Sequence, residues 1–167
     1  SGGEIVAIDE FDDVHFQLSK FNWRTVTSKE GGWFGLQCLI EFQENYLVCT
    51  SGAGLKEINK KNGKVSSSTI LGLEKLRFIR GAMVTEGKNL WVASNMGLFV
   101  KPNISNSASK VGIRFGLFDT DFEYKSFEAL GEKVLVKGDK YSYLLDEEKL
   151  IESLNANSIG EMSTILS

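Results

Sequence analysis

Apolar and polar residues recur along the chain in three similar stretches. These start at Asn45, Asn89 and Lys133, 44 residues apart, and read NYLVCTSGAGLKEI, NLWVASNMGLFV and KVLVKGDKYSYLL. Each has a short apolar run, a few small or polar residues and a second apolar run, which predicts two strands joined by a tight turn. A constant spacing near this length is typical of the blades of a β-propeller.

The sequence around each stretch extends the prediction to four strands per unit. GLQCLIEF, RGAMVTEG and YKSFEALG each come before a short turn and predict a first strand. INKKNGKVSSS, VKPNISNSASKVGI and LLDEEKLIESL place a polar turn between a third and a fourth strand, although DEEKLIESLNA could instead form an Asp-capped helix. The second strands are apolar on both faces, which favours sheets covered on each side by neighbouring sheets.

The two ends of the chain fit one divided unit. GEIVAIDE, VHFQLS and NWRTVTS predict a unit that lacks its first strand, and SIGEMSTILS predicts a lone first strand at the other end. This last strand could complete the sheet of the first unit and close a ring.

We therefore predict an all-β fold, a β-propeller of about four four-stranded blades. It would be either a closed small ring or an arc of a larger propeller, and a plain antiparallel sandwich is the alternative. The chain, 1–167, is interpreted as a single propeller domain or segment. Its units are expected at about 1–28 plus 159–167, 35–71, 80–115 and 124–154.

The stretch at 89–100 resembles the repeat of the two-component regulator propellers, in which a blade carries Leu-Trp-(Ile/Val)-Gly-Thr and then Gly-Leu. The matching residues are Leu90, Trp91, Val92, Ala93, Ser94, Gly97 and Leu98, with Ala93 and Ser94 in place of Gly and Thr. The resemblance implies a propeller blade and, as in that family, a sensory or binding module, but not a particular ligand. In such a blade Trp91 would fill the space between sheets, and Gly54 and Gly97 would take positive φ.

Composition and charge exclude several classes of partner. The chain has 167 residues, 42% of them hydrophobic, and a net charge of −3 with acidic and basic residues interspersed. We therefore expect no nucleic-acid partner, and no membrane insertion because no apolar run approaches the roughly 18 residues that span a bilayer. The first residues, SGGEIVAIDE, lack the pattern of a signal peptide, so the localisation stays open between the cytoplasm and a fragment of a larger protein.

Candidate chemistry is sparse. His15 is the only histidine and no nucleophile motif accompanies it, so we predict no catalytic residue, no cofactor, no metal ligand and no enzyme activity. The acidic run 9–13 and the pair Asp119 and Asp121 could bind calcium, but neither has EF-hand spacing. Cys38 and Cys49 should face each other across a hairpin, close enough for a disulfide, although we expect two small buried thiols in a reducing cell.

The loops carry the functional prediction. Loops between the second and third strands, and between units, should lie together on one rim of a propeller. The candidate partner-binding residues on these loops are Trp33, Thr50, Ser51, Ser94, Asn95 and Asp139. Trp33 is either a rim anchor for a partner or sugar, or a core residue at the start of a strand, and the core interpretation is favoured.

We predict a non-catalytic module, structural or partner-binding, that uses this rim to bind another protein or to self-associate. A small ligand or a glycan is a further candidate partner. The alternatives are a ligand-sensing extracytoplasmic propeller domain of a signalling protein, a structural component of a viral particle, and a glycan-active enzyme.

Overall fold

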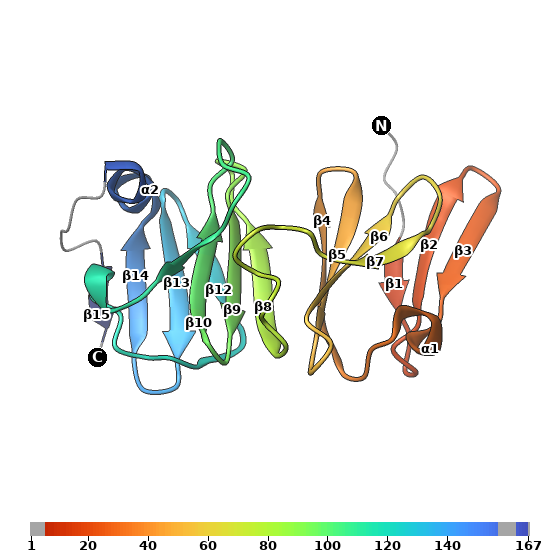
Figure 1. Cartoon of the computed structure of the whole chain (residues 1–167), viewed down its shortest axis with the longest axis horizontal. Coiled ribbons are helices and arrows are strands. Elements are labelled where there is room, and N and C mark those ends of the chain that lie inside the picture. The colour runs from red at the N-terminus through yellow and green to blue at the C-terminus, as the bar shows by residue number, and fades with distance from the viewer. Residues whose placement is uncertain (1–5, 157–162, 167) are drawn as a thin grey trace.

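The computed structural model describes residues 6–156 and 163–166, apart from the side chains of residues 123–126, 156, 163 and 164, and forms four antiparallel sheets (Figure 1). The first sheet contains β1 (Val6–Ile8), β2 (Val14–Ser19) and β3 (Asn22–Val26). The second contains β4 (Leu36–Phe42), β5 (Asn45–Thr50), β6 (Leu55–Asn59) and β7 (Val65–Ser67). The third contains β8 (Ile79–Val84), β9 (Leu90–Ser94), β10 (Gly97–Lys101) and β11 (Ser109–Val111). The fourth contains β12 (Phe122–Leu130), β13 (Lys133–Gly138), β14 (Ser142–Asp146) and β15 (Ser163–Leu166).

Three short helices complete the described elements: α1 (Ser28–Gly31), the 3-10 helix η1 (Ile113–Phe115) and α2 (Glu147–Ala156). The prediction of an all-β fold built from four repeated antiparallel sheets is confirmed, and the arrangement is propeller-like. Among the described residues no helix is long and apolar enough to cross a membrane.

The sheets stack face to face in chain order, and each interface has its own hydrophobic core. One core joins the first and second sheets, another the second and third, and another the third and fourth. Within the described parts of the chain, no hydrophobic cluster joins the first sheet to the fourth. In Figure 1 these two sheets lie at opposite ends of the row.

The second strand of each unit explains this stacking. In β5, Tyr46 and Val48 face the first sheet, whereas Leu47 and Cys49 face the third. Strand β9 follows the same rule, and all five of its residues are buried. Because side chains alternate between the two faces of a strand, a strand that is apolar throughout needs cover on both sides.

The fourth sheet corrects one expectation. Strand β15, expected to complete the first sheet, pairs instead with β14, with Leu145 opposite Ser163. Helix α2 is the reason, because it takes up the residues expected to form the turn and the fourth strand after β14. The position beside β14 is therefore left for β15. The side chain of Asp146 accepts a hydrogen bond from the backbone N–H of Lys149, so the alternative of an Asp-capped helix is confirmed. The first sheet has three strands among the described residues.

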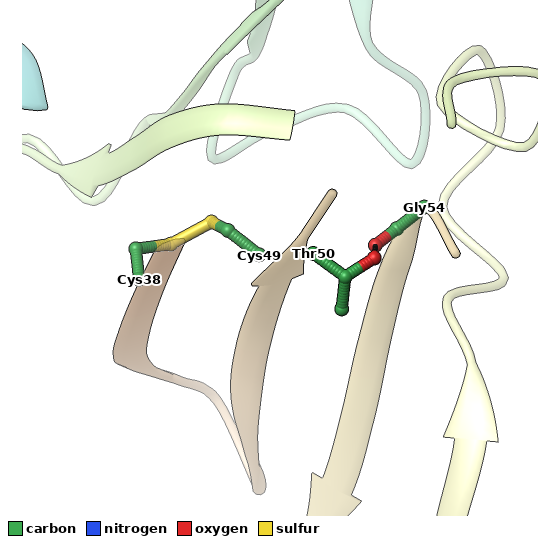
Figure 2. The surroundings of a disulfide bond; sticks show 4 residues. All are labelled: Cys38, Cys49, Thr50 and Gly54. Atoms are coloured by element: carbon green, nitrogen blue, oxygen red, sulfur yellow. Dashed lines mark hydrogen bonds between the residues drawn. A yellow bond between two sulfur atoms is a disulfide. The ribbon is translucent and has the colours of Figure 1, made fainter. Parts of the chain in front are cut away.

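Equivalent turns in the second and third sheets are closed by a buried hydroxyl. The Thr50 side chain donates to the carbonyl of Gly54, and Figure 2 shows the two residues turned toward one another. Ser94 donates in the same way to the carbonyl of Gly97. Gly54 and Gly97 have φ values of 77° and 123°, as predicted, which residues with a side chain rarely adopt.

Cys38 and Cys49 face each other across the β4–β5 hairpin, as the spacing predicts. The structure joins them in a disulfide bond (Figure 2), so the expectation of two free thiols is corrected. Their Cα atoms lie 4.8 Å apart, within the range that a disulfide requires. The expectation assumed a reducing compartment, which no residue pattern in the chain establishes.

Helix α2 also links the third sheet to the fourth through Glu147. Its carboxylate accepts hydrogen bonds from the Thr85 hydroxyl at 2.9 Å, the Asn89 side-chain amide at 3.0 Å and the Trp91 indole N–H at 2.6 Å. Trp91 is completely buried in the core between these sheets. A buried indole N–H needs such an acceptor, so Glu147 lets the ring fill the interface without leaving a donor unpaired.

Replacement of Trp91 with alanine should lower the free energy of unfolding by about 3 to 5 kcal/mol, because it leaves a large cavity in this core. Urea denaturation followed by circular dichroism measures the change. Trp23→Ala is the control, since Trp23 is largely exposed and its loss should cost no more than about 0.5 kcal/mol. Equal losses for the two variants would contradict the assigned packing.

Candidate partner-binding surfaces

The loops between second and third strands lie with the inter-sheet connections along one edge, which we call the loop rim. It comprises residues 33–35, 50–54, 76–80, 94–97, 112–122 and 138–141. Backbone hydrogen bonds tie the second sheet to the segment that enters the third there, because the N–H groups of Gly52 and Gly54 both donate to the carbonyl of Arg77. The β13–β14 turn, at the lower edge of Figure 1, continues this rim in the fourth sheet.

Three of the predicted rim residues are buried. Trp33 is 1% exposed and lies in the core between the first and second sheets, where its indole N–H donates to the carbonyl of Asp12 at 2.9 Å. This is the core position that the sequence favoured. Thr50 and Ser94 are fully buried and hold their turns. These side chains shape the rim without presenting a contact surface.

The other three predicted residues lie at the surface of the rim. Ser51 is half-buried and accepts a hydrogen bond from the side chain of Gln37 at 2.9 Å. Asn95 is exposed in the β9–β10 turn, and Asp139 is exposed in the β13–β14 turn. These positions belong to three successive sheets, so they are spread along the rim and form no single cluster.

The loops predicted to form the rim carry exposed apolar side chains, which the sequence did not single out as contact residues. Phe34, which follows the buried Trp33, is 86% exposed. Phe78 and Phe118 are also exposed, as are Met96 and Tyr141. Several large apolar side chains therefore lie at the surface along one edge of the molecule. The only sequence signal was their position beside glycines or at loop ends.

A carboxylate network organises the rim at the fourth sheet. Buried Asp119 accepts hydrogen bonds from the Tyr143 hydroxyl at 2.8 Å and from the backbone N–H groups of Lys140 and Tyr141. Burial alone would raise the pKa of Asp119, but these bonds and one from Asp139 hold that pKa below its usual range. The hydrogen bond between Asp139 and Asp119 raises the pKa of the Asp139 carboxyl, with smaller contributions from burial and from the Asp119 charge.

The remaining candidate chemistry of the sequence takes structural roles. His15 lies 2.7 Å from an oxygen of Asp9 and 2.8 Å from the hydroxyl of Thr25. The hydrogen bond from His15 lowers the pKa of Asp9. Asp121 pairs with Arg80 at 3.3 Å, while Asp119 is engaged as described above. Among the described residues, no cluster of His, Cys, Asp and Glu side chains is arranged to hold a metal ion.

The outward faces of the first and last sheets differ in character. On the first sheet that face carries His15, Gln17 and Thr25, with Trp23 as the large apolar side chain. On the fourth sheet it carries Leu135, which lies opposite Leu144 in the neighbouring strand. Both of these leucines are half-buried.

The exposure of Leu135 departs from the pattern of the repeat. Its equivalents are Leu47 in the second sheet and Trp91 in the third, and the following sheet covers both of them completely. The fourth sheet therefore ends the described row with the type of residue that is covered elsewhere. We call the outward face of the fourth sheet the end face. It carries Leu130, Leu135, Leu144 and Leu166 beside the charged Glu128 and Lys133.

No family model and no curated protein matches the chain. Among solved structures it is similar to PorZ of Porphyromonas gingivalis, described as an essential bacterial surface component of the type-IX secretion system. The TM-score is 0.58 at 9% sequence identity. The match covers 100% of this chain and 22% of the PorZ chain, so the chain spans about a fifth of the length of that structure. The likeness supports the fold.

Replacement of Asp139 with asparagine should stabilise the protein at pH 7. Because the folded-state pKa of Asp139 is raised, the folded protein holds its proton more tightly than the unfolded chain, and stability falls as the pH rises through that pKa. An asparagine amide can donate to Asp119 at any pH and avoids this loss.

Thermal unfolding of wild type and Asp139→Asn at pH 7 and pH 3 measures the effect. The gain in Tm should be present at pH 7 and absent near pH 3, where Asp139 is protonated in both states. Asp146→Asn is not a suitable control because Asp146 caps α2; the exposed Glu132→Gln serves instead and should show no such dependence. A gain in Tm that is equal at both pH values would contradict the hydrogen bond from the protonated Asp139 to Asp119.

Proposed function

We propose that this chain is a non-catalytic assembly module that buries its end face against a further β-sheet. The observation that carries the proposal is that Leu135 is only half-buried at a position where the repeat otherwise has a fully buried residue. Leucine side chains on the face of a sheet are stabilised when a further sheet covers them.

Two further observations support an arc over a closed ring. The hydrophobic cores join consecutive sheets, and the described residues form no core between the first sheet and the fourth. The whole chain also aligns with 22% of the length of a larger solved chain, as expected for a portion of a more extended array of sheets. The polar outward face of the first sheet suits the capped end of such an array.

In the purified chain, the sheet available to cover the end face is that of a second copy. Wild type should therefore form a dimer or larger species from the 18.5 kDa chain as its concentration rises toward about 1 mM. Leu135→Glu should shift it to the monomer, because it places a charge in the contact. Sedimentation equilibrium measures the masses.

Gln17→Glu is the matched control, since it adds the same charge to the outward face of the first sheet. It should leave the self-association unchanged. A monomeric wild type across this concentration range, or equal effects of the two variants, would contradict the proposal.

A second candidate function is the binding of a polypeptide along the loop rim, and the exposed Phe78 and Phe118 side chains favour it. Aromatic residues at an otherwise polar surface are the usual anchors of protein contacts. The two phenylalanines belong to the connections before and after the third sheet, so an extended segment could contact both.

Peptides selected from a random phage-displayed library against wild type should lose binding to Phe78→Ser and Phe118→Ser by at least about tenfold. Phe21→Ser is the control, because Phe21 is more exposed than either phenylalanine but lies in the β2–β3 turn at the opposite edge. Biolayer interferometry compares the affinities. Peptides that bind all four proteins equally would exclude the rim as their site.

A further inference from the structure

A cavity of about 410 Å³ lies between the second and third sheets, at the edge opposite the loop rim. The β4–β5 turn, the segment 69–71 and the ends of β6 and β10 line it. Two side chains of opposite charge, Glu57 from β6 and Lys101 from β10, face this space. Lys101 is only 6% exposed, which is unusual for a lysine.

Lys101 occupies a position that the repeat otherwise fills with a core residue. Tyr46, Leu90 and Val134 are equivalent residues of the second strands in the last three sheets. The residues that lie opposite them on the third strands are therefore equivalent too, and these are Ile58, Lys101 and Leu145. Ile58 and Leu145 are both completely buried in hydrophobic cores. Of these three sheets, only the third has a charged residue at this position.

Glu57 departs from the repeat on the facing side of the same interface. It opposes Leu47, just as Val100 opposes Trp91 in the third sheet. Val100 is buried and packs in one core with Leu145, so the interface between the third and fourth sheets is apolar at this level. The interface between the second and third sheets has Glu57 and Lys101 instead. Such replacements of core residues by charged ones destabilise a fold and are expected at functional positions.

The two charges do not neutralise one another directly. Among the described residues, no carboxylate oxygen lies within 4 Å of the Lys101 ammonium. Lys101 donates one hydrogen bond, of 3.3 Å, to the carbonyl of Pro102, and it lies 5.5 Å from the centre of the Phe42 ring. An ammonium has three N–H donors, so donors remain for a molecule in the cavity.

Glu57 also retains hydrogen-bonding capacity. It accepts from the Ser68 hydroxyl at 3.2 Å and from the Asn45 amide at 3.4 Å. Burial raises the pKa of Glu57 and lowers that of Lys101, which shows that the cavity penalises both unpaired charges. A bound molecule with complementary groups would remove these penalties.

We propose that this cavity binds a small organic carboxylate, which Lys101 holds by a charge-assisted hydrogen bond while Glu57 accepts from a hydroxyl or ammonium group of the same molecule. The volume suits a metabolite-sized ligand, since small-molecule sites begin at about 300 Å³. The side chains of Asn45 and Thr69 add polar contacts, and Phe42 and Ile70 supply an apolar wall. This site is separate from both the end face and the loop rim.

Three small probes test the recognition chemistry by NMR titration of the ¹⁵N-labelled protein. L-lactate and L-serine each carry the carboxylate and a hydrogen-bond donor, whereas ethanolamine has the amine and hydroxyl groups but no carboxylate. Lactate and serine should cause saturable shifts in the backbone amides of residues 43, 45 and 70 at concentrations up to about 50 mM. Ethanolamine should not.

Two variants and a control assign the effect to the cavity. Lys101→Met keeps the apolar stem and should weaken lactate and serine binding at least about tenfold. Lys75→Met, which removes an exposed lysine elsewhere, should leave binding unchanged. The double variant Glu57→Val/Lys101→Leu reproduces the apolar pair of the next interface, so it should fold with a higher Tm and show no response.

Any of three results would overturn the proposal. The first is the absence of saturable shifts with both carboxylates. The second is an undiminished response in Lys101→Met or in the double variant. The third is a response to ethanolamine equal to that of serine, because recognition would then not require the carboxylate. None of these outcomes bears on the self-association through the end face, which is measured without ligand.

Discussion

The structure depends on the requirement that a strand with apolar residues on both faces be covered on both sides. In β5 and β9 every second residue points toward the preceding sheet and the others toward the following sheet. The second and third sheets are thus each a wall of two cores, and removing one sheet would expose the next. The stacking order, the position of the turns along one edge and the character of the two outward faces all follow from this alternation.

The sequence predicted the parts of the fold that depend on local pattern. The 44-residue spacing located the central strands of the second, third and fourth sheets, and Gly54 and Gly97 marked equivalent turns. Long-range pairing was harder to predict. The partner of β15 depends on helix α2, and a run such as DEEKLIESLNA has the composition of either a polar turn or a helix. Asp146 was the available signal for the helix.

The surfaces were predictable only in outline. A loop rim followed from the alternation of strands and turns, but of two adjacent aromatic residues there one is buried and the other is exposed. Trp33 enters the core because Asp12 supplies an acceptor for its indole N–H, whereas Phe34 points to solvent. No local pattern distinguishes the two. Glu57 and Lys101 looked like ordinary charged strand residues until the register showed which positions they share with Val100, Ile58 and Leu145.

The carboxylate of Glu147 has a consequence for how neighbouring sheets are aligned. Contacts between apolar faces have little directional preference, so two such sheets could slide or rotate over one another at small cost. Hydrogen bonds from Thr85, Asn89 and Trp91 meet at one carboxylate of the adjoining unit, and they are satisfied together in a single relative placement. Polar anchoring at the periphery thus sets the angle between units, and with it the curvature that a longer array of the same units would inherit.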